Sequence, residues 1–202
     1  MTVFKEIWDF FKRHWLHFLL APPGAILCTA LHEAAHALAV LLQGGRVLEF
    51  AWMPGGGRWG YIRFLFPPGG GQSREAVSIA PYVLWLSMML LTALLAWRWP
   101  QPRPSIAATL FIWCFVVPLG DIANTALPYW LGWENDFTAA FGVASLWSRS
   151  GIILFGAAAT ISGRWVEQRL YGAKSISWAA YMLLALSGLL LVGVLNILID
   201  FL

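Results

Sequence analysis

The stretch that decides the fold is AILCTALHEAAHALAVLL, residues 25–42, an apolar run that carries three polar side chains, His32, Glu33 and His36. A run of this length and composition can cross a bilayer as a helix. Imidazole and carboxylate groups are costly in hydrocarbon, so these three side chains are expected to face a protein interior or a wet cavity. The run therefore predicts a membrane-spanning helix that carries a functional site.

The composition of the whole chain supports membrane embedding. Of the 202 residues, 59% are hydrophobic and 11% are charged, whereas a soluble domain is about 25% charged. The net charge of +3 does not indicate a nucleic-acid partner, because the basic residues lie in short gaps between apolar runs, where they set membrane orientation. We expect one integral, multi-pass membrane domain, residues 1–202, with the lipid bilayer as its surroundings.

The N-terminal segment, residues 1–20, reads as an amphipathic helix that lies in the membrane interface. Its aromatic residues recur at helical spacing, and basic residues lie mainly off that stripe. The alternative is a packed surface helix. The breaker Pro22-Pro23-Gly24 is expected to end this helix before the polar-bearing span, residues 25–43, begins.

Residues 44–73 differ from the rest of the chain. Two runs rich in β-branched and aromatic residues, 46–53 and 58–66, flank the turn sequence Pro54-Gly55-Gly56-Gly57, and a second proline- and glycine-rich breaker follows. This pattern predicts a membrane-associated β-hairpin. Neither glycine run is followed by Gly-Lys-Ser/Thr, so a phosphate-binding loop is not expected.

Residues 76–202 contain the remaining spans. The predicted fold is a mainly α-helical bundle of about five transmembrane helices, with four or six as alternatives, plus the amphipathic N-terminal helix and the hairpin. Pro118 and Pro128 are expected to kink or break the second of these remaining spans. The apolar stretches after the hairpin are residues 76–97, 105–133, 137–163 and 175–199. Arg149 interrupts the third, which is expected to be either one long helix or a short helix followed by a span.

The polar groups in residues 25–42 form the motif H-E-x-x-H, with His32 and His36 four residues apart. Side chains at this spacing lie on one face of a helix, so both imidazoles can approach one ion. Glu33 is offset around the helix axis and can reach a water molecule on that ion. Zinc lowers the pKa of bound water, and a carboxylate can take the proton. The motif predicts a Zn²⁺ site with two histidine ligands and Glu33 as catalytic base; the alternative is a polar cluster that stabilises helix packing.

A catalytic zinc site needs a third protein ligand and an open position for water. Asp121 is the preferred third ligand, because it is the only acid besides Glu33 within an apolar spanning stretch. Its alternative roles are a helix cap or a partner for a buried arginine such as Arg149. Asn124, one helical turn further on, is a candidate for substrate binding, with a helix-end role as the alternative. Less favoured candidate ligands are His14, His17, Cys28, Glu134 and Asp136.

An H-E-x-x-H motif in a membrane span, a glycine-bounded hairpin after it and an aspartate on a later span resemble the site-2 protease family of intramembrane zinc metalloproteases. The resemblance covers residues 31–124 and is to a minimal form without a PDZ domain. It implies hydrolysis of peptide bonds in a transmembrane or membrane-proximal substrate. By motif, His32 and His36 would be zinc ligands, Glu33 the base and Asp121 the third ligand. The family usually has Leu-Asp-Gly where this chain has Leu-Gly-Asp, ending at Asp121.

Two further readings compete with that resemblance. One is a different membrane-embedded zinc hydrolase, and the other is a non-catalytic membrane protein, either a substrate-binding protein or a metal transporter. The intact Glu33 argues against a substrate-binding protein without activity, because zinc binding alone does not need it. A transporter would need metal-binding groups along a path, whereas this chain concentrates them at one place. The hairpin is expected to bind an extended substrate along its edge, with a purely structural role as the alternative. No regulatory partner is indicated.

Overall fold

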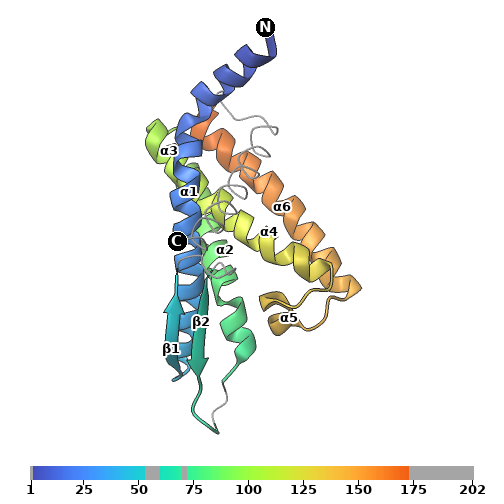
Figure 1. Ribbon diagram of the computed structural model, residues 1–202. Helices are drawn as coiled ribbons and strands as arrows, with labels where there is room; N and C mark the ends of the chain where they lie inside the picture. Colours follow the sequence, from blue (N-terminus) through green and yellow to red (C-terminus); the bar gives the residue numbers. More distant parts are fainter. Residues whose placement is uncertain (1, 53–59, 70–71, 173–202) are drawn as a thin grey trace.

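The computed structural model describes residues 2–52, 60–69 and 72–172, and this part of the chain is mostly helical with one two-stranded hairpin (Figure 1). The described helices pack side by side, and the hairpin lies against one of them, α1. The elements are α1 (Thr2–Leu42), β1 (Arg46–Ala51), β2 (Tyr61–Leu65), α2 (Arg74–Arg98), α3 (Pro104–Phe111), the π-helix η1 (Ile112–Val116), α4 (Val117–Trp130), α5 (Asp136–Phe141) and α6 (Leu146–Tyr171).

Within the described residues, three helical stretches are long and apolar enough to cross a membrane: Trp15–Leu42, Arg74–Arg98 and Pro104–Trp130. They match the first three predicted spans. Residues 137–163 are not one long helix: the chain turns at Gly142, where φ is 73°, and this turn separates the short α5 from the long α6. This is the division of the second alternative, although α6 is not among the three stretches long and apolar enough to span. The predicted span 175–199 lies outside the described residues. The expected number of about five spans is therefore matched only as far as three.

Helix α1 runs without interruption through Pro22 and Pro23, so the expected break after residue 20 is wrong. The two prolines are adjacent, which confines the loss of backbone donors to one turn. Packing against η1 supports the helix at this point. The indole Nε1 of Trp113 donates to the Leu20 carbonyl at 2.8 Å, and a Cβ on Gly24 would lie 2.7 Å from the Trp113 ring. The segment predicted to be interfacial and the motif-bearing segment are therefore parts of one continuous helix.

The irregularity expected between Pro118 and Pro128 lies earlier in the chain, at η1. Helix α4 itself is unbroken, with Pro118 in its first turn and Pro128 in its last. Proline cannot donate to the carbonyl four residues before it, and its ring crowds that group. The wider π turn before Pro118 relieves this crowding. As a result, Asp121 lies on a regular helix that packs against α1 and α2.

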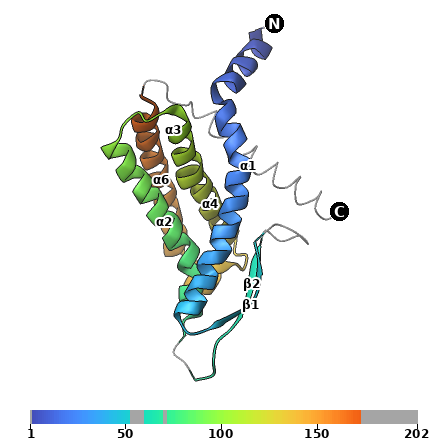
Figure 2. The same ribbon diagram turned by 90° about the vertical axis from the view of Figure 1, so that its left-hand side faces the viewer.

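The predicted hairpin is confirmed as an antiparallel pair, with Arg46 opposite Leu65 and Ala51 opposite Tyr61. It lies alongside the last turns of α1 (Figure 2). Two glycines mark where it approaches that helix. A Cβ on Gly45 would lie 2.6 Å from Val40, and one on Gly60 would lie 2.9 Å from both Thr29 and Glu33. Strand β2 thus begins beside the predicted catalytic residue and runs back toward the C-terminal end of α1.

Candidate metal centre

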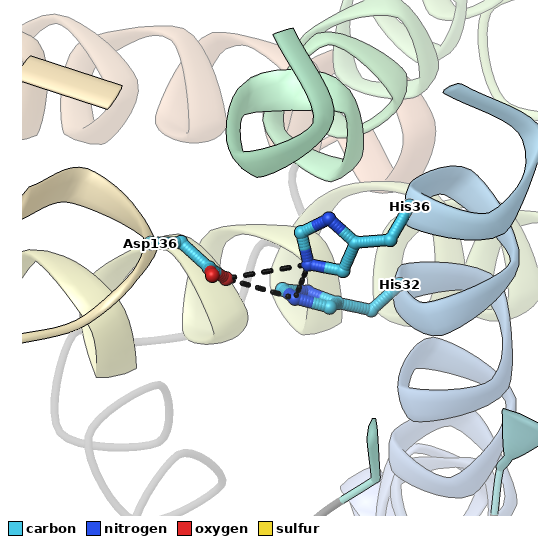
Figure 3. Close-up of side chains that lie close together, drawn as sticks. All are labelled: His32, His36 and Asp136. Carbon is cyan, nitrogen blue, oxygen red and sulfur yellow. Dashed lines mark hydrogen bonds and ion pairs between the residues drawn. The ribbon is translucent and has the colours of Figure 1, made fainter. Parts of the chain in front are cut away.

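The motif histidines project from one face of α1 toward α5, as the geometry of an i, i+4 pair requires (Figure 3). His32 Nε2 and His36 Nε2 are 3.1 Å apart. The carboxylate that faces them belongs to Asp136. Its Oδ2 is 3.4 Å from His32 Nε2 and 3.3 Å from His36 Nε2. Among the described residues, His32, His36 and Asp136 form the group that could hold a metal ion, with ligand atoms all within 4.8 Å of one another.

Asp136 is the first residue of α5, a helix of only six residues whose position depends on Asn135. The Asn135 side chain accepts hydrogen bonds from the backbone N–H groups of Phe137 and Thr138, which caps the helix. Its Nδ2 donates to the Thr125 carbonyl on α4 at 2.8 Å. One side chain therefore starts the helix and ties it to the neighbouring α4.

The far nitrogens of both imidazoles have fixed hydrogen-bond partners. His36 Nδ1 is 2.7 Å from the Val77 carbonyl, and His32 Nδ1 is 2.7 Å from Asp121 Oδ2. Carbonyl and carboxylate oxygens only accept, so each Nδ1 carries the proton. The Nε2 of a neutral imidazole is then a bare acceptor. Trp85 Nε1 donates to the same Asp121 oxygen at 2.8 Å, which holds that carboxylate in place.

These contacts bring three acceptors together: two Nε2 lone pairs and one carboxylate oxygen, at separations of 3.1, 3.4 and 3.3 Å. With neutral imidazoles, no proton lies between any two of them. A single added proton would satisfy one pair only, whereas a cation at the centre would satisfy all three. Ligand atoms about 2.0–2.1 Å from a tetrahedral zinc ion are about 3.4 Å from each other. The donor set and its spacing fit a zinc ion.

The surroundings of Asp136 favour its charged form. Burial acts to raise the pKa of this carboxyl, but hydrogen bonds from the His32 and His36 imidazoles outweigh burial and hold the pKa well below its usual range. Those hydrogen bonds exist only when both Nε2 atoms are protonated, whereas with neutral imidazoles a bound cation would take their place beside the carboxylate. The Tyr82 hydroxyl also donates to Asp136 Oδ2 at 3.2 Å, and its ring meets the His32 ring edge-on, with centroids 5.7 Å apart. Asp136 is thus held as a carboxylate, which is the form that binds metal.

Glu33 is buried beside this group but is not one of its three members. A Cβ on Gly60 would lie 3.0 Å from Glu33 Oε1. The backbone just before β2 therefore lies so close to the carboxylate that a side chain at this position would crowd it. Both Glu33 and His32 line a cavity of about 700 Å³ between α1 and α4, as do Asp121 and Asp136. The carboxylate of Glu33 is therefore available to a molecule in that cavity.

The other predicted site residues have distinct places. Asp121 lies on the opposite edge of the His32 ring from Asp136, and its carboxylate contacts His32 and Trp85, not Arg149. Asn124 and Glu134 line the cavity. Cys28 lines it too but is outside the three-residue group. His17 lies far along α1, where its Nε2 is 2.6 Å from the Tyr171 hydroxyl. The side chain of His14 is outside what the structure describes.

The arrangement therefore favours Asp136 over Asp121 as the third ligand. In the sequence, Asp136 lies in a polar loop between apolar runs, which made it a less favoured candidate ligand. The sequence patterns did not identify Tyr82, Trp85 or the Val77 carbonyl as supporting groups, or Gly60 as a neighbour of Glu33. One local signal was available: Asn135 and Thr138 have the spacing of a helix cap, which places Asp136 at the start of a helix.

Comparison of the chain with protein-family models, with curated proteins and with solved structures gave no match.

Proposed function

We propose that this protein is an integral, multi-pass membrane zinc endopeptidase of the site-2-protease type, with zinc held by His32, His36 and Asp136. The observation that carries the proposal is the meeting of three acceptor atoms at 3.1–3.4 Å with Glu33 beside them in a cavity. Two imidazoles, one carboxylate and an open side are the pattern of a catalytic zinc site. The helices around it include the three that are long and apolar enough to cross a membrane.

A zinc ion held there would polarise a water molecule and lower its pKa toward neutrality. Glu33 would accept the proton of the attacking water and later deliver it to the nitrogen of the leaving amine. Asp121 would keep the His32 ring oriented through Nδ1, and the Val77 carbonyl would do the same for His36. The cavity wall at Asn124 would offer an amide to the substrate backbone.

The hairpin supports a protease over another hydrolase. In a membrane, a helical substrate hides its carbonyls in its own hydrogen bonds. A strand edge beside the site could hold the unwound segment by main-chain hydrogen bonds. Strand β2 begins at the Glu33 carboxylate and runs alongside α1, where such an edge would deliver a peptide to the zinc. A hydrolase acting on a small molecule has no use for this arrangement.

The test is metal analysis of the purified protein together with cleavage of a reconstituted transmembrane peptide. The native protein should bind about one zinc per chain and cleave the peptide. Glu33→Gln should keep zinc and reduce turnover by about 10²–10⁴-fold, the usual contribution of a general base. Glu75→Gln, which changes an exposed carboxylate at the start of α2, is the matched control and should cleave normally. Near-native cleavage by Glu33→Gln would refute the mechanism.

A further inference from the structure

The cavity beside the metal centre has two chemically different ends. Around the three ligands it is polar, with Asp121, Asn124, Glu134 and Asn135 in its wall. Away from the ligands it continues between α1 and the η1–α4 segment, where its wall is almost entirely apolar. The residues lining this second part are Ala21, Ala25 and Cys28 on α1 and Ile112, Val116 and Val117 on the facing segment. We call these six residues the apolar groove.

The hairpin and the apolar groove flank successive stretches of the same helix: the hairpin lies beside the stretch that carries the histidine ligands, and the groove lines the stretch before it. The hairpin flanks α1 from Val40, beside Gly45, back to Glu33 and Thr29, beside Gly60. The groove begins at Cys28, one turn before His32, and its α1 wall ends at Ala21. A substrate that follows the hairpin to the zinc would therefore enter the groove if it continued in the same direction along α1.

The length of the groove follows from helix geometry. Ala21 and His32 are eleven positions apart, which is about 16 Å along the axis. An extended peptide covers about 3.3–3.6 Å per residue, so this distance corresponds to four or five residues. The α1 wall offers only small side chains, Ala21, Ala25 and Cys28, so the space is kept open for side chains of the occupant.

We propose that the apolar groove is a binding subsite for four or five extended apolar residues on one side of the scissile bond. This inference rests on the proposed function and adds the substrate class: peptides whose cleavage site is followed, on the groove side, by a short apolar stretch. Beyond Ala21 the subsite ends, so longer apolar stretches gain nothing further. Ala25 lies midway along α1 between Ala21 and Cys28, which makes it the position that reports on occupancy.

The probe is a series of straight-chain alkyl hydroxamates, from acetohydroxamate through octanohydroxamate to dodecanohydroxamate. The hydroxamate group binds zinc, and the alkyl chain would lie in the groove. Binding to the zinc-loaded, detergent-solubilised protein is measured by the rise in Tm with ligand concentration, because a ligand of the folded state stabilises it. Each buried methylene should tighten binding by up to about fourfold. The gain should level off for the longest chains.

The variants place a larger side chain at defined positions along the apolar groove. Ala25→Phe should leave acetohydroxamate affinity and zinc content unchanged and remove most of the gain from octanohydroxamate. Ala25→Leu fills less of the groove and should reduce the gain from octanohydroxamate by a smaller amount. It keeps the test valid if Ala25→Phe does not fold. Ala21→Phe should affect only the longest chain. Leu27→Phe is the matched control on the same helix, because Leu27 is 40% exposed and is not part of the cavity wall. It should behave as the native protein does.

The outcomes separate the two proposals. If zinc and acetohydroxamate bind but Ala25→Phe and Leu27→Phe show the native dependence on chain length, the subsite is refuted and the zinc enzyme stands. If the native protein binds neither zinc nor acetohydroxamate, the proposed function fails and the subsite fails with it. Loss of the chain-length gain in Ala25→Phe alone supports the subsite, because detergent and zinc are the same in both variants.

Discussion

Asp121 and Asp136 face opposite edges of the same His32 ring, but the helices that carry them are very different. Asp121 lies in the middle of α4, a 14-residue helix continuous with η1 and α3. Asp136 begins α5, which has six residues. Helices this short have little stability of their own in water. The comparison shows that the proposed ligand is on the weaker element, whereas the group that orients the histidine is on the stronger one.

This difference gives the metal centre two sides: a rigid side at Asp121, and a dependent side at Asp136, whose position depends on the contacts of α5. On the rigid side, Trp85 and the α4 backbone hold the Asp121 carboxylate. On the dependent side, Asp136 is placed by the Asn135 cap and by packing of Phe137 on Tyr82, with ring centroids 4.5 Å apart. Changes on the dependent side should therefore act on metal affinity through the position of one short helix. Four substitutions test this division, in order of decreasing expected effect.

Asp136→Ala should have the largest effect, because it removes a proposed ligand. Zinc affinity should fall by more than about 100-fold, beyond the range expected for an outer group, and cleavage should be lost with it. The measurement is titration of the zinc-loaded protein with a competing chelator. Native zinc affinity in Asp136→Ala, combined with loss in Asp121→Ala, would reverse the roles of the two aspartates.

Asp121→Ala should weaken zinc binding by about 10–100-fold, the usual effect of removing the partner of a ligating histidine. Zinc should still be bound when it is supplied in excess. Asp121→Asn is the informative companion variant, because an amide oxygen can still accept from His32 Nδ1. It should retain most of the affinity. Equal losses in both variants would show that the charge of Asp121, and not its hydrogen bond, matters.

Asn135→Ala should weaken zinc binding by about fivefold, which corresponds to the loss of about 1 kcal/mol when a helix N-cap is removed. The same chelator titration measures it. Ser145→Ala is the matched control, since Ser145 caps α6 in the same way and lies outside the cavity wall and the three-residue group. It should lower stability without changing zinc affinity. Similar zinc losses in both variants would attribute the effect to general destabilisation.

Trp85→Phe should have the smallest effect, less than about threefold on zinc affinity, because it removes only the indole donor to Asp121 and keeps an aromatic ring in the core. Trp113→Phe removes an indole hydrogen bond of the same length, 2.8 Å, from a different place, the Leu20 carbonyl. That variant should bind zinc as the native protein does. An unchanged affinity in Trp85→Phe would mean that α4 alone orients the Asp121 carboxylate.

The sequence predicted the two ligands that lie on one helix, His32 and His36, but it did not favour the ligand that comes from a distant loop, Asp136. The reason is physical. The spacing of His32 and His36 determines their geometry as soon as a helix forms, and the apolar run around them makes that helix certain. The position of Asp136 depends instead on how a polar loop folds back over α2 and α4. No periodicity encodes that contact. Asp121 ranked higher because its surroundings were apolar, and apolar surroundings suit an orienting group as well as a ligand.

The fold shows the same division. The hairpin and three long helices follow from alternation, turn residues and apolar length. The break expected at Pro22 and Pro23 did not occur, because the outcome depended on a partner remote in sequence, the Trp113 indole, which packs at Gly24. The division of residues 136–171 into a short α5 and a long α6 was one of two alternatives that the sequence left open. It depends on the positive φ at Gly142 and on the caps at Asn135 and Ser145.

The continuity of α1 determines how deep in a bilayer the chemistry would take place. Trp15, 60% exposed, is the kind of residue that rests at the boundary between lipid headgroups and hydrocarbon. His32 lies 17 positions further along the same helix, which is about 25 Å along the helix axis, and the hydrocarbon layer is about 30 Å thick. The scissile bond would then lie within a few ångströms of the opposite leaflet's surface. Water would reach it from that side, and a transmembrane substrate would be cut near one end of its span.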